Sequence, residues 1–219
     1  MKKLTLIPVL SLLLMAFVIG CGSKTDATKT TQNTSSGETK SVSNTGTSVA
    51  VNSGVSVIKW VGKKVTGQHD GTINLKNGQF TVENGKLTGG QFDIDMNTLT
   101  VNDIKDAETN AKLLGHLKSD DFFSVDKFPV STFKITKLAP ATEGGNYMVT
   151  GDLTIKGITK PITFPANVTI NGNSVTTTAN FDIDRTEFDI RYGSGKFFEG
   201  LGDKMINDNF NLTLDVKSN

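Results

Sequence analysis

Few residues in this chain have the types and spacing for acid–base or metal chemistry. There are two histidines, His69 and His116, and no H-x-H or H-E-x-x-H spacing, so no metal site is predicted. The only arginines are Arg185 and Arg191. Because Arg185 follows Asp184, we expect it to pair with a carboxylate, with a phosphate headgroup as the alternative partner. No nucleophile elbow, P-loop or dinucleotide motif occurs, and we predict no catalytic residue and no cofactor.

The single cysteine, Cys21, has the sequence context for acylation. A short basic start is followed by an apolar run over Leu4–Ile19, and Gly20 directly precedes the cysteine. This pattern is typical of an export signal and resembles a bacterial lipobox. The run is shorter than the roughly 20 residues of a spanning helix, which disfavours a buried cysteine beside such a helix. We predict a signal peptide over residues 1–20 and lipidation at Cys21. Gly22, the residue after the cysteine, favours sorting of the lipoprotein to the outer membrane.

The composition changes abruptly between residue 21 and residue 52. Thr, Ser, Lys, Asn and Gly dominate there and no aromatic residue occurs, so the segment buries too little apolar area to offset the entropy lost on ordering. We expect residues 21–52 to be a lipid anchor and flexible tether, with a glycosylated stalk as the alternative. Residues 53–219 are long enough for one domain with a sizeable core.

Charge and residue counts narrow the functional classes further. The chain has 23 Lys and Arg against 22 Asp and Glu, or 21 against 22 once Lys2 and Lys3 leave with the signal peptide. A nucleic-acid binder needs a clustered basic face, so we predict no nucleic-acid partner. Lipidation of Cys21 would leave no thiol for a disulfide or for catalysis. The 13 Phe against one Trp and two Tyr indicate a large, dry apolar interior.

Apolar and polar residues alternate over most of the domain. Residues 72–96 alternate in three runs that are interrupted at Asn77-Gly78 and at Asn84-Gly85. An Asn-Gly pair between such runs predicts a hairpin, because a type I′ turn needs positive φ at both central residues. Further antiparallel strands with one apolar face are expected at residues 132–138, 147–155, 162–170, 175–183 and 210–216.

One segment has helical spacing instead. From Asn102 to Lys118 apolar residues recur every three or four positions, which predicts an amphipathic helix. Asn102 or Asp103 can cap it, and Leu114 and Leu117 should face the sheet. Eight or nine strands and one helix with short connections favour an all-β fold, a closed antiparallel barrel with the helix packed across it, because closure removes exposed sheet edges.

Four motifs occur in order along the domain: W-x-G…G-x-H-x-G at 60–71, H-L-K-S-D-D-F-F with K-F-P-x-x-T-F at 116–133, G-x-L-T-I-x-G-x-T-K-P-I at 151–162, and R-x-x-F-D-I at 185–190. Together they resemble the YceI-like family of lipid- and polyisoprenoid-binding proteins, over essentially all of residues 55–216. The resemblance implies an eight-stranded antiparallel lipocalin-like β-barrel with a long apolar cavity, and carriage of an isoprenoid or another long-chain amphiphile. Barrels of about eight strands can hold one small ligand.

Simple energetics favours a long ligand. Burial gains about 0.8 kcal/mol per CH₂, whereas association costs about 4 to 15 kcal/mol, so several isoprene units are needed to break even. The candidate ligand-binding residues lie on the apolar phase of their strands or in the last motif: Trp60, His69, Phe92, Ile94, Phe133, Phe164, Phe181, Arg185 and Phe188.

Alternation does not separate residues that line a cavity from those that pack a solid core. Two other functions therefore stay open: a surface interaction module with a filled barrel, and an enzyme on a lipophilic substrate that uses His69 or His116 as a base. The sequence does not define the oligomeric state.

Overall fold

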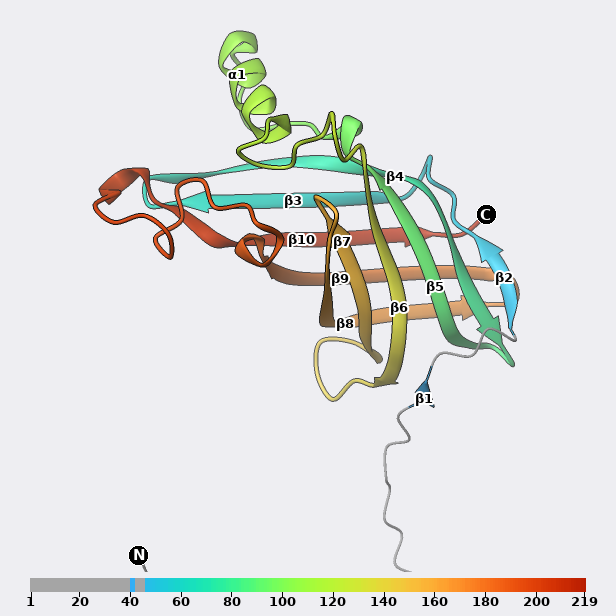
Figure 1. Cartoon of the computed structure of the whole chain (residues 1–219). Helices are drawn as coiled ribbons and strands as arrows, with labels where there is room; N and C mark the ends of the chain where they lie inside the picture. The colour runs from blue at the N-terminus through green and yellow to red at the C-terminus, as the bar shows by residue number, and fades with distance from the viewer. Residues whose placement is uncertain (1–39, 42–45) are drawn as a thin grey trace, which may run out of the picture. The chain divides into compact units, whose positions relative to one another are not determined.

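The structure is a computed structural model that describes residues 40–41 and 46–219 (Figure 1). The predicted signal peptide, the predicted lipidation site Cys21 and the predicted tether up to residue 45, except residues 40–41, lie outside the described residues.

Eight long strands form a closed antiparallel barrel. Each strand pairs with its neighbours in the order β6-β5-β4-β3-β10-β9-β8-β7, and β7 pairs back onto β6, which closes the sheet. The fold class predicted from the sequence is therefore confirmed. The strands are β3 (Val57–Lys64), β4 (Gly67–Glu83), β5 (Lys86–Asp95), β6 (Val130–Pro140), β7 (Tyr147–Ile155), β8 (Ile158–Asn171), β9 (Ser174–Asp184) and β10 (Ile206–Lys217).

One of the predicted Asn-Gly hairpins, at Asn77-Gly78, is wrong. Asn84 and Gly85 have φ values of 52° and 70° and join β4 to β5 as expected. Asn77-Gly78 instead lies inside β4, where the pairing with β5 shifts register between Leu75 and Asn77. This shift is a β-bulge, and it reverses which alternate residues face inward. A bulge also bends the strand, which lets one 17-residue strand follow the curvature of the barrel.

The ordered domain begins earlier than predicted. Strand β2 (Thr47–Ala50) pairs with β4, with Thr47 opposite Val82, and Val51 is buried. Residues 47–51, predicted as part of the tether, therefore belong to the folded domain. The composition concealed this strand, because cross-strand hydrogen bonds to β4 fix it despite its many small polar residues. The two-residue strand β1 (Lys40–Ser41) pairs with β6.

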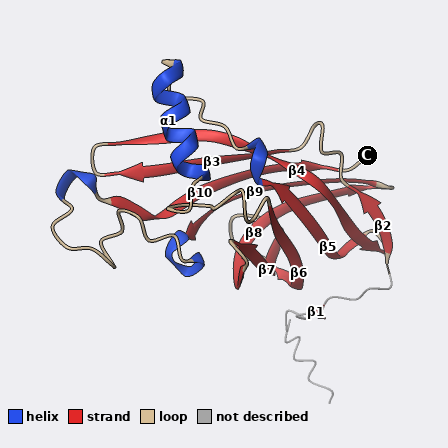
Figure 2. Ribbon diagram, turned by 45° about the horizontal axis from the view of Figure 1, so that its top comes forward, coloured by secondary structure: helices blue, strands red, loops and turns tan. Residues whose placement is uncertain are grey.

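The predicted helix is shorter than its apolar spacing suggested. Helix α1 spans Ala107–Lys118, and the side chain of Asp106 caps it by accepting a hydrogen bond from the Thr109 N–H at 2.9 Å. Ile104 belongs to the preceding loop but packs against the same core as Leu114, so it prolongs the helical spacing without being helical. The helix has no buried residue, and it stands outside the strands (Figure 2).

Short 3₁₀ helices occupy three connections: Met96–Thr98 after β5, Arg185–Phe188 after β9, and Gly202–Lys204 before β10. The loop between α1 and β6 and the loop between β9 and β10 lie at the same end of the barrel, since the ring of Tyr192 is 5.6 Å from that of Phe122. The residues that line the interior at this end therefore come from distant parts of the chain.

Candidate functional site

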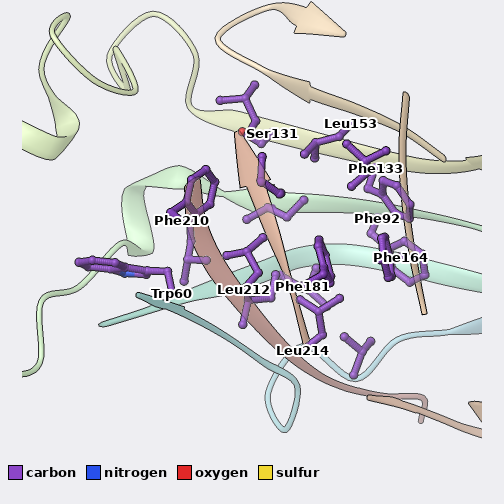
Figure 3. Close-up of a pocket in the computed structure, with 18 of the residues that line it drawn as sticks. Trp60, Phe92, Ser131, Phe133, Leu153, Phe164, Phe181, Phe210, Leu212 and Leu214 are labelled. Atoms are coloured by element: carbon purple, nitrogen blue, oxygen red, sulfur yellow. The ribbon is translucent and has the colours of Figure 1, made fainter. Parts of the chain in front are cut away.

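The barrel encloses a cavity of about 210 Å³ that all eight long strands line (Figure 3). Its lining is almost wholly apolar. The polar side chains among the lining residues are few: Ser131, Thr177, Arg185 and Asn207. Such a surface suits a hydrocarbon ligand, because an unpaired polar or charged ligand group would lose its hydration there without compensation.

Five phenylalanine rings form a continuous row across the interior. Each ring contacts the next, and the centroid distances along the row are 5.2, 6.5, 5.6 and 3.9 Å. The last pair is stacked with an interplanar angle of 7°. Figure 3 shows four of these rings projecting from different strands toward one another. The row, in order, is Phe80, Phe92, Phe133, Phe164 and Phe181.

Glycines on the same or a neighbouring strand provide the space for two of these rings. A Cβ atom on Gly78 would lie 2.8 Å from Phe92 Cδ1, and one on Gly90 would lie 3.1 Å from the same ring. A Cβ atom on Gly151 would clash with the ring of Phe133. A side chain larger than hydrogen at these positions would therefore displace the rings of Phe92 and Phe133.

The interior is hollow and not filled solid. Several inward side chains line the cavity and yet keep accessible surface, whereas neighbours such as Ile58 and Phe164 are buried. Interiors packed to normal density leave few voids larger than a water molecule, so this accessible surface belongs to a real space within the barrel. The partly accessible lining residues are Phe133, Phe181, Phe210, Leu212 and Leu214.

Trp60 closes part of one end of the cavity. Its indole Nε1–H donates a hydrogen bond to the carbonyl oxygen of Thr100 at 3.1 Å, which satisfies the one polar atom of a buried tryptophan. The indole reaches this carbonyl across Gly71, the residue paired with Trp60 on β4. A Cβ atom at Gly71 would clash with the Thr100 carbonyl and lie 2.7 Å from Trp60 Nε1.

Arg185 lines the cavity, but its hydrogen-bonding capacity is used within the protein. Its Nε–H donates to Asn207 O at 3.0 Å, Nη1 donates to Ile190 O at 2.9 Å and Tyr192 O at 2.8 Å, and Nη2 donates to Ile206 O at 3.1 Å. Its ion-pair partner is Asp208, 3.5 Å away, and not the adjacent Asp184.

Those contacts give Arg185 a structural role. It ties the loop after β9 to the start of β10, and all five N–H groups of the guanidinium are engaged. Burial lowers the pKa of Arg185, while the carboxylates of Asp208 and Asp184 act in the opposite direction. These contacts disfavour the headgroup contact considered from the sequence, because all five N–H groups already have acceptors within the protein; that Arg185 contacts a ligand stays a prediction.

Two other predicted ligand residues lie outside the cavity lining. His69 is on the inward phase of β4, paired with Gly62 of β3, but its Nδ1 lies 2.8 Å from Asp103 Oδ2. Partial desolvation, the largest single effect, raises the pKa of Asp103, but hydrogen bonds from His69 and from the Asp70 and Asp103 backbone N–H groups, with the charge of His69, together lower it overall. Phe188 is buried in a second core cluster with Ile190 and Phe122. It lies in the 3₁₀ helix that follows β9, so the in-and-out alternation of the strand no longer sets the direction of its side chain.

The remaining predicted residues do line the cavity: Trp60, Phe92, Ile94, Phe133, Phe164 and Phe181. That they contact a ligand stays a prediction. The sequence reasoning did not name the β10 residues Phe210, Leu212 and Leu214, nor Phe80, as ligand candidates. β10 alternates apolar and polar residues in the sequence, but this pattern does not show that the apolar face of β10 borders the cavity.

The described part of the chain contains no group of three or more His, Cys, Asp or Glu side chains arranged to hold a metal ion. His116, the second histidine, packs its ring 4.6 Å from that of Tyr192 and places Nε2 3.1 Å from Asp121 Oδ2. None of the described helices has the length and hydropathy needed to cross a membrane.

A closed eight-stranded barrel with a narrow apolar interior defines the lipocalin-like class of folds. The YceI-like domain profile matches residues 34–218. The chain therefore belongs to the YceI-like family, as its motifs indicated.

Relatives and solved structures agree with this assignment. A UPF0312 protein of Shewanella denitrificans is 35% identical over 102 residues, and one of Yersinia enterocolitica is 32% identical over 146 residues. These matches cover 47% and 67% of this chain, but only 50% and 64% of the relatives' own lengths.

Among solved structures, BcnA of Burkholderia cenocepacia superposes with a TM-score of 0.61 at 24% identity, over 77% of this chain and 99% of BcnA. A polyisoprenoid binding domain from Saccharophagus degradans has a TM-score of 0.54 at 13% identity, over 77% of this chain and 96% of that domain. At these identities the likeness concerns the fold.

Proposed function

We propose that this protein is a non-enzymatic carrier of the cell envelope that holds the chain of a long lipophilic ligand, a polyisoprenoid or similar amphiphile, inside the barrel. The observation that carries the proposal is the hollow apolar interior. Its one charged lining residue, Arg185, has no free donor, so the interior suits hydrocarbon and the polar headgroup stays outside. Binding of a polyisoprenoid by the Saccharophagus domain, which shares the fold, supports this choice.

The dimensions of the cavity favour a slender chain. Its volume of about 210 Å³ is below the roughly 300 to 1,000 Å³ typical of pockets for drug-sized ligands. A single alkyl or isoprenoid chain fits a narrow space between flat phenyl rings better than a wide ring system does. Of the described residues that line the cavity, none is a histidine, which disfavours the alternative of an enzyme with His69 or His116 as base.

The decisive experiment is mass spectrometry of organic extracts from the purified protein, with a variant that fills the cavity. Leu212 faces inward beside Trp60 and Phe181, so Leu212→Trp should remove the co-purified lipid and leave the melting temperature nearly unchanged. Thr213→Trp is the matched control, because Thr213 is the next residue and points to the outer face; it should keep the lipid.

A filled barrel gives the opposite pattern. In a solid core, Leu212→Trp would overpack and destabilise by about 1 to 3 kcal/mol, and the parent protein would yield no lipid to lose. That combined result would reject the carrier and support a surface interaction module.

We further propose that Cys21 anchors the carrier to the envelope membrane, with the outer membrane favoured by Gly22. The support is the lipobox-like sequence. Cys21→Ser should move the protein from the membrane pellet to the soluble envelope fraction after cell fractionation. Membrane association equal to that of the parent chain would reject the anchor but leave the proposal for the cavity intact.

A further inference from the structure

Exposed apolar side chains gather at one end of the barrel. The described residues include six exposed large hydrophobic side chains, and five of them lie at this end, while Val55 lies elsewhere. We call these five the rim patch: Val65, Tyr192, Phe197, Phe198 and Met205. Single exposed apolar residues need no explanation, but a cluster bordered by polar residues marks an interaction site.

Two segments that are distant in sequence bring the rim patch together. The N–H of Val65, in the turn between β3 and β4, donates a hydrogen bond to Met205 O at 3.2 Å. The guanidinium of Arg191 lies 4.8 Å from the centroid of the Phe197 ring. Figures 1 and 2 both show the segment before β10 beside the β3–β4 turn.

Unpaired positive charges border the rim patch. Residues 63–65 and 191–205 contain five Lys or Arg and two Asp or Glu, but Arg191 and Lys196 pair with Asp189 and Asp184 just outside these segments, which leaves three cations against two anions, a net charge of +1. Of these, Lys63, Lys64 and Lys204 are exposed, and within the described part of the chain none of the three has a carboxylate within 4.0 Å. Their charges are available to an anionic partner.

The rim patch also borders the cavity. Ile190 and Ile206 line the cavity at this end. Ile206 directly follows Met205, Ile190 lies two positions before Tyr192, and the Ile206 N–H donates to Gly193 O at 2.8 Å. A surface that covers the patch would therefore face this end of the cavity.

We propose that the rim patch is a contact surface for an anionic lipid bilayer. Aromatic and aliphatic side chains enter the boundary between headgroups and acyl chains, and flanking lysines attract anionic headgroups. Val65 beside Lys64, and Met205 beside Lys204, repeat this arrangement. A self-associating apolar surface does not need the excess of cations. The proposal is independent of what the cavity holds and of whether Cys21 is lipidated.

Quenching by brominated lipid tests the proposal on the full chain. Phe198→Trp places a reporter in the rim patch, and Val55→Trp places a matched one at the other end of β3. Each is mixed with vesicles of phosphatidylglycerol and phosphatidylethanolamine that have brominated acyl chains, and the emission of the parent's Trp60 is subtracted. We expect the Phe198→Trp signal to fall by at least half and the Val55→Trp signal to stay unchanged.

Because any affinity of the N-terminal apolar run is common to both variants, the difference between the two reporters measures the patch alone. Removing the lysines with Lys63→Ser and Lys64→Ser should weaken vesicle binding roughly fivefold for each lysine, and phosphatidylcholine vesicles should give little quenching. Equal quenching of the two reporters, or none at Phe198→Trp, overturns the proposal. So does a blue shift of Phe198→Trp that grows with protein concentration without vesicles, which would identify a second copy as the partner.

Discussion

Replacement of the buried arginine tests whether the loop at the barrel end is held as the structure indicates. Arg185→Leu removes four hydrogen bonds to main-chain carbonyls and an ion pair with Asp208. Hydrogen bonds to a charged group contribute about 1.5 to 3 kcal/mol each, but they share one side chain and do not add fully. Breaking a buried pair on one side costs about 3 to 5 kcal/mol, and we expect a loss of that size.

Such a loss lowers the melting temperature by about 6 to 20 °C, since each kcal/mol corresponds to about 2 to 4 °C in a chain of this size. Trp60 is the only tryptophan and is buried, so its fluorescence reports urea unfolding without a label. Arg191→Leu is the matched control, because that arginine is exposed and contacts Asp189 and the Phe197 ring at the surface; it should cost about 1 kcal/mol or less.

An Arg185→Leu protein that is destabilised by less than about 1 kcal/mol, or no more than the Arg191→Leu protein, would refute this reasoning. It would mean that water or local rearrangement satisfies the four carbonyls. Arg185→Lys should fall between the parent and Arg185→Leu, because an ammonium group has three donors where the guanidinium has five.

Two further predictions concern the same end of the barrel and use the same unfolding assay. Gly71→Ala should destabilise the protein by several kcal/mol, because the new Cβ collides with the Thr100 carbonyl, which cannot move freely. Gly67→Ala, which has open space around it, should be nearly neutral. Similar losses for both variants would show that the Thr100 carbonyl does not lie this close to Gly71. Asp184 is partly desolvated, yet hydrogen bonds from Lys196 and Thr186 lower its pKa overall. The stability that it contributes is therefore present above about pH 4, the unfolded value, and is lost as the pH falls through the folded pKa. Asp184→Asn should be less stable than the parent at pH 7, and the difference should shrink toward pH 3; a constant difference would show that the carboxylate charge is not involved.

The sequence by itself predicted most of the barrel strands, and it favoured closure because closure removes exposed sheet edges. Period-two alternation is a local property, because each side chain's face follows from its neighbours two positions away. The turn at Asn84-Gly85 was predictable for the same reason, since positive φ at two adjacent residues is a local demand. The motifs added the family, which an independent profile match confirmed.

Where distant strands set the conformation, local reasoning was wrong. Asn77-Gly78 has the residues of a hairpin turn, but its pairing with β5 continues on both sides and makes it a bulge. Strand β2 has the composition of a tether, but β4 supplies its hydrogen bonds. Ile104 extends the apolar spacing of a helix that begins only at Ala107. A loop residue that packs against the core gives the same apolar spacing in the sequence as a helical residue does, so the sequence could not separate the two.

Only the tertiary structure separated cavity from core. Phe164 and Phe188 are both apolar and inward by sequence, yet one lines the cavity and the other packs in a second cluster. The difference depends on whether a neighbouring strand leaves the facing volume empty, and no single segment encodes that. Closure of the barrel likewise brought Arg185 to four carbonyls and gathered the rim patch from residues more than 100 positions apart along the chain, because contacts of this kind exist only once the sheet has closed on itself.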